Sequence, residues 1–283
     1  MALNQFGGNK SRTIISVPVY SIIRLLMQMD QLYAEALQNM EAWLCAFEKL
    51  VPAPKLVSLG GQPAFRYTEK TVHQAIVQKL ARLVSGLHAA RVLMAHGYVQ
   101  ELGALQRMLD EFREDVTFLS LAVINNDLTE LHVRYLEAFY QEEFDKSDDP
   151  VGSTQDRPMI PRKKIQAYIA QSEAAALEPS RSIQLSRTIS KAYSGFVHGA
   201  SPHIMEMFGG NPAKFHVQGL LGTPRFAEHE RDLWNFFYRG ILAFGFAAKC
   251  FGSEELFRSV LEYRDHFEVA SGKDYSDARN EPT

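Results

Sequence analysis

The sequence has few cysteines and little net charge, and each shortage excludes classes of protein. Its two cysteines, Cys45 and Cys250, lie in apolar helical patterns without metal-ligand spacing. We therefore expect them to be reduced core residues and the protein to be cytoplasmic. The formal charge of -3 gives no signal for a protein that coats duplex DNA, although it allows a local basic groove.

Long apolar runs and common cofactor motifs are also missing. The most apolar stretch, residues 13–27, is interrupted by Pro18 and Arg24, and no small-residue cleavage pattern follows it. We therefore expect neither a signal peptide nor a membrane-spanning helix. The sequence contains no GxxxxGK[ST] or GxSxG motif and no GxGxxG after a strand, so no cofactor is expected.

Apolar residues at helical spacing fill most of the chain. The clearest series runs from Ile22 to Leu50 in alternating steps of four and three, which predicts a long helix with one apolar seam. Asp127 with Glu130 indicates the start of a later helix. Comparable patterns predict the other helices over residues 72–96, 102–123, 131–139, 165–176, 183–198 and 228–250, and after Ser253.

The connections between these helices differ in composition. Residues 51–67 hold three prolines and a Gly-Gly pair, which predicts a loop or short hairpin, and a second small hairpin is expected at 214–222. Residues 145–160 predict a flexible loop, and 271–283 a disordered tail. The sequence thus predicts a mainly α fold, an up-and-down bundle of about eight helices forming one domain over residues 1–270.

The stretch "KAYSGFVHGASPHIMEMFGG" over residues 191–210 is the main functional lead. His198 ends a predicted helix, where it could act as a general acid or base or only cap the helix. We expect its ring to face the helix that carries Arg107, and His203 to be a loop residue of lesser consequence. His203, His216 and His229 share no i,i+4 spacing, so no metal site is expected.

Arg107 and Glu111 lie four residues apart on the predicted helix 102–123. They could form a solvated ion pair or an inward-facing pair whose polar partner is Tyr193 or His198. We expect Arg107→Ala to destabilise the fold more than a surface substitution does, because a partly buried Glu111 would lose its partner.

Two segments carry a family resemblance. "LHAARVLMAHGYVQELGALQRMLDEFREDVTFL" and the later "AYSGFVHGASP" resemble an uncharacterised bacterial family of helical proteins related to the HEPN superfamily. That pattern has a helix pair with Arg-x-x-x-Glu on the second helix, and then a late Tyr-x-x-x-x-His before a glycine or serine. The likeness spans roughly half of the chain.

The resemblance implies a helical bundle, a homodimer and, in active members, metal-independent RNA cleavage by an Arg-x(4–6)-His motif. The matching positions here are Lys191-x6-His198, with a lysine that lacks the planar fork of arginine. Literal matches elsewhere, such as Arg91-x4-His96, are about as frequent as chance predicts. The implied function is an RNA-cleaving or nucleic-acid-associated component of phage defence, or a toxin, in which His198 is the acid or base and Lys191 or Arg107 holds a phosphate.

A second function remains open beside the first. In this alternative the protein is a non-enzymatic helical interaction module, and Arg107, Glu111, His198 and Tyr193 form a buried structural network. Both functions are compatible with a homodimer, which we expect because the 22–50 seam and the small residues over 240–248 offer more packing surface than one bundle needs. Whether the protein is an enzyme is left open by the sequence.

Overall fold

The fold is mainly α, as predicted from the apolar periodicity. A computed structural model describes residues 19–146, 148–172, 188 and 191–273. The long helices are α1 (Val19–Glu48), α2 (Val72–Ala95), α3 (Val99–Ile124), α8 (Pro224–Cys250) and α9 (Glu254–Ala270). Shorter elements are β1 (Lys55–Leu59), β2 (Gln62–Arg66), α4 (Glu130–Tyr140), η1 (Pro150–Gly152), α5 (Arg162–Ser172), α7 (Ser201–Ile204), η2 (Met205–Met207), β3 (Phe208–Gly209) and β4 (Lys214–Phe215).

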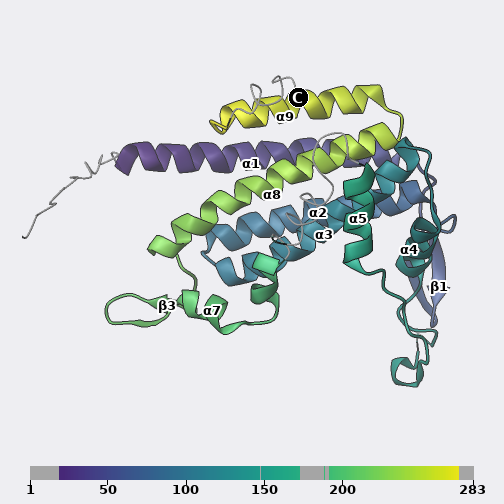
Figure 1. The fold of residues 1–283 in the computed structure, drawn as a ribbon, viewed down its shortest axis with the longest axis horizontal. Helices are drawn as coiled ribbons and strands as arrows, with labels where there is room; N and C mark the ends of the chain where they lie inside the picture. The colour runs from purple at the N-terminus through teal and green to yellow at the C-terminus, as the bar shows by residue number, and fades with distance from the viewer. Residues whose placement is uncertain (1–18, 147, 173–187, 189–190, 274–283) are drawn as a thin grey trace, which may run out of the picture.

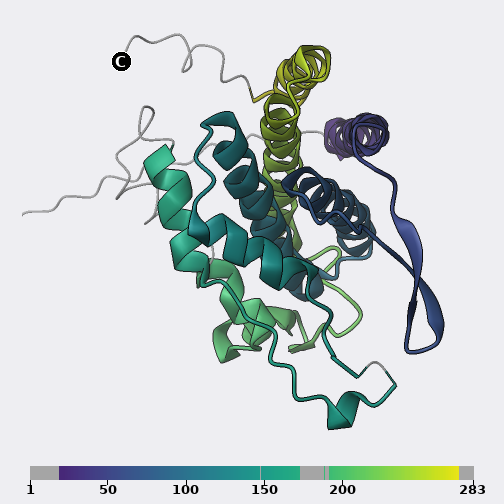
Figure 2. The ribbon, with the colours of Figure 1, turned by 90° about the vertical axis from the view of Figure 1, so that its right-hand side faces the viewer.

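Helices α2, α3 and α8 contact one another in the middle of the molecule, and the other long helices pack around them. Helix α1 lies along α2 and α8, α9 covers α8 and α1, and α5 lies against α3 (Figures 1 and 2). One continuous apolar core joins these elements. No described helix is long and apolar enough to cross a membrane.

The apolar seam of α1 is buried within the chain. Tyr33 stacks on Phe237 of α8 with ring centroids 4.5 Å apart, and the Trp43 indole donates to Ser259 Oγ of α9 at 3.0 Å. Gly240, among the small residues of α8, lies against side chains of α1 and α2. The α1 seam and the small residues of α8, from which a homodimer was expected, are therefore covered by other helices of the same chain. The homodimer stays a prediction, but these two surfaces no longer support it.

Two details of the helical pattern differ from expectation. Cys45 is exposed, because it lies on α1 between the buried seam residues Trp43 and Phe47 and so faces away from them. The helix expected to start at Asp127 is instead capped by Thr129, whose backbone N–H donates to His132 Nδ1 at 3.1 Å. Asp127 lies in the turn that closes the end of α3, since its N–H donates to the Ala122 carbonyl.

Both predicted hairpins exist, one of them displaced. Strands β1 and β2 pair antiparallel within residues 51–67, around a turn in which Gly60 and Gly61 have positive φ. The second hairpin pairs Phe208 with Phe215 and thus lies earlier than the expected 214–222. The reason is that residues 210–213, which include Gly210 at φ 87°, supply the turn.

The other connections are only partly within the described residues. Residues 145–160, expected to be a flexible loop, contain the short helix η1, and Arg157 Nε of this segment donates to the Ala138 carbonyl of α4. The expected tail at 271–283 lies outside the described residues from 274 onward, and so does most of 183–190.

Candidate functional site

Residues 191–197 form a helical segment that lies across α3 and α8. Phe196 covers Gly103, where a Cβ would lie 2.6 Å from the phenylalanine ring. Tyr193 contacts Phe236 of α8 edge to face at 5.7 Å and interacts electrostatically with Asp110, two turns beyond Gly103. The segment therefore runs antiparallel to α3, and glycine at position 103 permits the close approach.

His198 follows directly after this helical segment and is exposed. Its backbone N–H donates to the Ser194 carbonyl at 3.1 Å, so it continues the last helical turn. Lys191 is also exposed, two turns earlier on the same face, which puts the two Cα atoms about 10 Å apart along the axis. Neither side chain has a hydrogen bond or ion pair to another described residue.

The two histidines of the 191–210 stretch have exchanged their expected positions. His198 faces solvent rather than the Arg107 face of α3. His203 is half-buried, its Nε2 donates to the Ala192 carbonyl at 3.1 Å, and its ring meets Phe196 at 4.5 Å. Gly199, at φ 60°, turns the chain back so that α7 brings His203 against Gly195, where any Cβ would collide with the imidazole.

Arg107 and Glu111 form the expected i,i+4 ion pair, with 2.9 Å between Nη2 and Oε1. Their side chains are 24% and 37% exposed, so the pair lies at the edge of the core. It is thus neither the fully solvated pair nor the inward-facing pair that the sequence allowed. Arg107 shares a helix face with Gly103 and Asp110. The pair thus borders the 191–197 segment, but His198 is not its partner.

Asp110 is the centre of a buried polar cluster that the sequence reasoning missed. Arg239 of α8 places Nη1 2.6 Å from Asp110 Oδ1, and Arg113 Nε lies 3.9 Å from the same oxygen. Burial raises the pKa of Asp110, while Arg239, Arg113 and Arg107 oppose that shift. Asp110 Oδ2 and Arg113 Nε are buried and have no hydrogen-bond partner among the described residues.

Tyr193 lies beside this cluster. Burial, reinforced by the negative charge of Asp232, raises the pKa of the Tyr193 hydroxyl, so the phenol is neutral at physiological pH. Because Tyr193 is neutral, half-buried and packed on Phe236, we assign it the role of positioning the 191–197 segment.

A second polar cluster follows one turn along α3. Arg162 of α5 forms ion pairs with both Glu114 and Asp115, and Gln166 donates to Glu114 at 3.1 Å. Burial lowers the pKa of Arg162, but the charges of Asp115 and Glu114 outweigh burial, so its pKa is raised overall. The sequence signal was the charged run "DEFRED" inside an apolar stripe, since such charges become buried only when paired.

The ammonium of Lys79 completes the second cluster. It lies 2.8 Å from Asp115 Oδ2 and 5.0–5.9 Å from the centroids of three aromatic rings, those of Phe112, Tyr135 and Phe139. A cavity of about 350 Å³ opens beside it between α3, α4 and the segment before α5. Each charged group that lines the cavity is already in an ion pair, which is typical of a network that joins helices.

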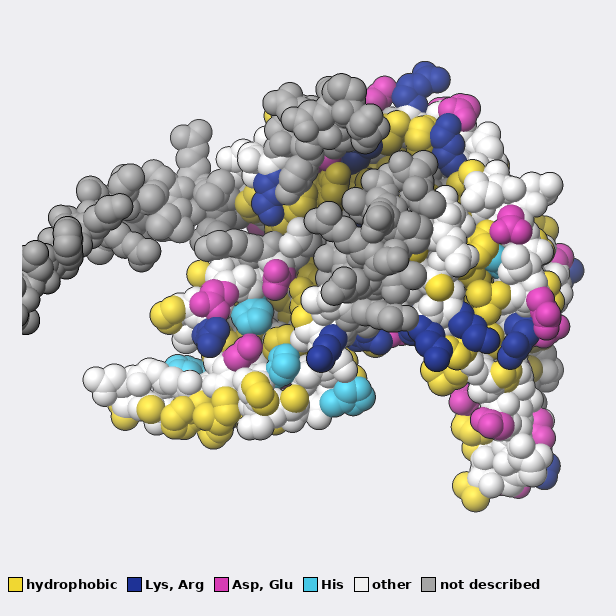
Figure 3. Space-filling view, viewed as in Figure 1, with side chains coloured by type: hydrophobic (Ala, Val, Ile, Leu, Met, Phe, Trp, Pro, Cys, Tyr) yellow, Lys and Arg dark blue, Asp and Glu magenta, His cyan; other side chains and the backbone are white. Residues whose placement is uncertain are grey.

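Two further histidines, His216 and His229, lie near α7 and the start of α8 in the chain, and several histidines gather on this part of the surface (Figure 3). His229 Nε2 lies 3.3 Å from Glu206 Oε2, and His216 Nε2 donates to the Gly209 carbonyl at 3.2 Å. No group of three or more potential metal ligands occurs among the described residues. The contact with Glu206 joins the segment between residues 200 and 222 to α8, whereas the bond of His216 lies within that segment.

No protein-family model, curated protein or solved structure matches the chain. The resemblance to HEPN-related proteins therefore rests on the two quoted segments, and the function must be argued from the geometry described above.

Proposed function

We propose that the protein is a HEPN-like helical protein that cleaves RNA without a metal ion, as a component of phage defence or as a toxin. The observation that carries the proposal is the placement of His198, whose imidazole is exposed and has no partner among the described residues. An exposed imidazole without a competing partner is free to act as a general acid or base toward a bound substrate. Lys191, on the same helix face, is the cation that would accompany it.

The chemistry needs one proton removed and one delivered. The 2′-hydroxyl of RNA attacks the adjacent phosphorus and loses its proton, the bond to the 5′ oxygen breaks, and that oxygen gains a proton. The products are a cyclic 2′,3′-phosphate and a free 5′-hydroxyl. His198 would perform one of the two proton transfers and water the other, while Lys191 stabilises negative charge on the phosphoryl oxygens.

The local charge of this region favours a polyanion. Between residues 191 and 217 the only carboxylate is Glu206, against Lys191 and Lys214. Glu206 is paired with His229. A weakly basic surface on a protein of net charge -3 attracts RNA locally without coating it.

Arg107, Glu111 and Tyr193 have a supporting role in this proposal. They lie at the border of the Asp110 cluster, against which the 191–197 segment packs. We assign them to positioning the segment that presents Lys191 and His198, and not to contact with the scissile phosphate.

The test is an incubation of the protein with a panel of RNAs in the presence of a chelator. We expect the wild type to cleave and His198→Ala to cleave about 10² to 10⁴ times more slowly, with an unchanged circular dichroism spectrum. His96→Ala is the matched control, because His96 is also exposed and ends a literal Arg-x4-His match. Cleavage that survives His198→Ala, or is lost with His96→Ala, would refute the assignment of His198.

The interaction module remains the second candidate, and one observation favours it. The segment from the end of the 191–197 helix to the start of α8 exposes an unusual number of large apolar side chains, namely Val197, Ile204, Met205, Phe208, Phe215, Val217 and Leu221. Exposed apolar groups that lie together often mark a surface for another protein. A wild-type protein that cleaves no RNA in the panel would favour this function.

A further inference from the structure

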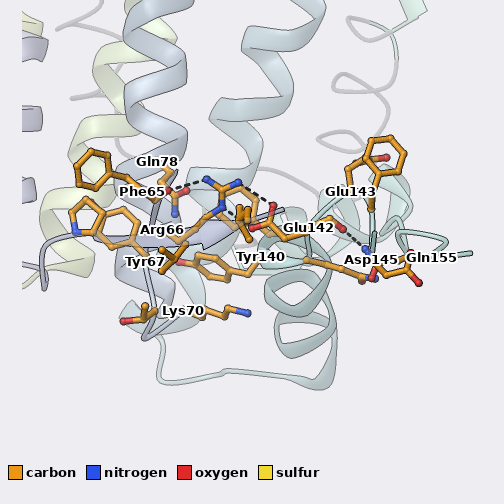
Figure 4. A pocket seen from close by; sticks show the side chains of 17 residues that line it. Phe65, Arg66, Tyr67, Lys70, Gln78, Tyr140, Glu142, Glu143, Asp145 and Gln155 are labelled. Atoms are coloured by element: carbon orange, nitrogen blue, oxygen red, sulfur yellow. Dashed lines mark hydrogen bonds and ion pairs between the residues drawn. The ribbon is translucent and has the colours of Figure 1, made fainter. Parts of the chain in front are cut away.

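A cavity of about 1030 Å³ lies between the β1–β2 hairpin, α2 and the end of α4 (Figure 4). The hairpin stands away from the helical body (Figures 1 and 2). Arg66 ties it to the residues after α4, with Nε 2.6 Å and Nη2 3.0 Å from the two carboxylate oxygens of Glu142. A volume of this size is typical of sites that hold a small organic ligand.

One side of the cavity is apolar and aromatic. Val57 and Leu59 line it from β1, where they lie on the same half-buried face of the strand. Tyr67 and Tyr140 line the cavity as well, and the Tyr140 hydroxyl is fixed because it donates to the Thr71 carbonyl at 2.7 Å. These four side chains offer a ligand an apolar surface.

Most charged groups around the cavity already have a partner of opposite charge. Arg66 pairs with Glu142, and Glu143 Oε2 lies 3.1 Å from Arg157 Nη1. These pairs add no net charge to the cavity. Two lining residues differ, because neither Lys70 nor Asp145 forms an ion pair with another residue in the described part of the chain.

Lys70 has an unusual backbone conformation. Its φ is 56°, in the left-handed region that a lysine rarely adopts, and such residues are common at functional sites. The next residue, Thr71, caps α2 by accepting from the Gln74 N–H. The charge of Lys70 reaches the cavity, since Arg66 and, to a smaller extent, Lys70 hold the pKa of Glu142 below its ordinary value. The exposed ammonium of Lys70 is therefore available to an anionic group of a ligand.

Asp145 supplies the opposite charge from the loop after α4. Figure 4 shows Lys70 on the side of Tyr67 and Tyr140, and Asp145 away from them. The Asp145 carboxylate accepts a hydrogen bond from Ser153 Oγ at 2.5 Å, which fixes its position and lowers its pKa. It is thus ionised at neutral pH, and because Ser153 is neutral, its negative charge is not compensated by that bond.

We propose that the cavity binds a zwitterion with an apolar side chain, whose carboxylate pairs with Lys70 and whose ammonium pairs with Asp145. A ligand with one charge would leave one of these two residues without a partner, and a neutral ligand would leave both. The apolar side chain would pack on the side formed by β1 and the two tyrosines. Free amino acids and short peptides share this chemistry.

This site is separate from the residues that the RNA-cleaving function uses. Neither Lys191 nor His198 lines the cavity. The zwitterion site therefore stands or falls independently of RNA cleavage.

The first measurement is isothermal titration calorimetry of the wild type with four related compounds. Phenylalanine and the dipeptide phenylalanyl-phenylalanine carry both charges, whereas N-acetylphenylalanine lacks the ammonium and phenylalaninamide lacks the carboxylate. We expect each blocked compound to bind about tenfold more weakly than phenylalanine, because one charge-assisted hydrogen bond is lost. The tighter of the two zwitterions identifies the source, an amino acid or a peptide. A wild type that binds neither zwitterion would overturn the proposal.

The second measurement repeats the titrations with variants that remove one charge each. Lys70→Gln should weaken phenylalanine about tenfold but leave phenylalaninamide unchanged, because the amide has no carboxylate to lose. Asp145→Asn should weaken phenylalanine to a similar extent but leave N-acetylphenylalanine unchanged. If Lys70→Gln weakens both compounds equally, the lysine does not recognise the carboxylate and the proposal is wrong.

Matched controls remove the same charges outside the cavity. Lys163 is an exposed lysine of α5, and Asp149 accepts from the Gly152 N–H in the same loop as Asp145, but neither lines the cavity. Lys163→Gln and Asp149→Asn should bind phenylalanine like the wild type. A loss of binding in these controls as large as in Lys70→Gln or Asp145→Asn would also contradict the assignment. Unchanged circular dichroism spectra show that the variants are folded.

Discussion

Arg239 of α8 places its guanidinium 2.6 Å from the carboxylate of Asp110 on α3 and stacks over the ring of Phe236 at 4.7 Å. Both charged side chains are largely buried. Because burial alone lowers the pKa of Arg239 and raises that of Asp110, each charge depends on the other to stay in the core. This ion pair joins the two central helices at the level where Tyr193 packs.

Removing one partner of this pair should cost far more than a surface change. We expect Arg239→Met to lower the free energy of unfolding by about 3 to 5 kcal/mol, because it leaves Asp110 as an uncompensated buried carboxylate. Urea denaturation at neutral pH measures the change. The double variant Arg239→Met with Asp110→Asn carries no unpaired charge and should recover part of the loss. A single variant as stable as the wild type would show that water reaches Asp110.

Arg107→Ala should have a smaller effect. The Arg107–Glu111 pair is partly exposed, so solvent screens it, and its removal should cost about 1 kcal/mol or less. This loss in the free energy of unfolding is smaller than the loss expected for an inward-facing pair. It is also smaller than the loss expected for Arg239→Met. The two variants should be compared in the same denaturation series. A loss for Arg107→Ala that equals the loss for Arg239→Met would show that Arg107 contributes directly to the Asp110 cluster.

The two cysteines should differ in their reaction with iodoacetamide. Burial raises the pKa of the Cys250 thiol to about 12, so almost no thiolate is present at pH 8, whereas Cys45 is exposed. We expect mass spectrometry to find Cys45 alkylated in the native protein and Cys250 alkylated only after denaturation. Equal labelling of both thiols in the native state would contradict the burial of the α8 end.

Gly97 and Gly61 make a matched pair for testing the α2–α3 corner. Both have a positive φ, 74° and 79°, so alanine is strained at either position by roughly 1 kcal/mol. Only at Gly97 would the Cβ also meet backbone, 2.7 Å from Leu221 N, while Gly61 has open space. We therefore expect Gly97→Ala to lower the melting temperature clearly more than Gly61→Ala. Equal shifts would mean that the 220–221 backbone can move away.

The long helices could be predicted from the sequence because their apolar stripes are regular. Tyr33, Met40 and Phe47 belong to the predicted apolar stripe of α1, and all three are buried, as expected for side chains that face the core. The stripe could not reveal its partner, however, since an apolar seam looks the same whether another helix of the chain or a second copy covers it. The expected dimer seam is covered by α2, α8 and α9 of the same chain.

The candidate site was predicted less well, for reasons that are local and physical. His198 shares the exposed helix face of Lys191, so the ring expected inside lies outside, and the turn at Gly199 brings His203 to the inner place. Arg107 with Glu111 could be paired from spacing alone. The partner of Asp110 could not be predicted from spacing, because Arg239 lies far along the sequence. Only the packing of α8 on α3 brings the two residues together.

The packing of α1 has a consequence for the newly made chain. Helix α1 is synthesised early, but its seam is covered in part by α8 and α9, and the contact between Trp43 and Ser259 spans 216 residues. At a translation rate of about 5 to 20 residues per second, roughly ten to forty seconds pass before that partner emerges. During this interval the aromatic seam of α1 is without its final cover, which makes it a surface that a ribosome-associated chaperone would bind.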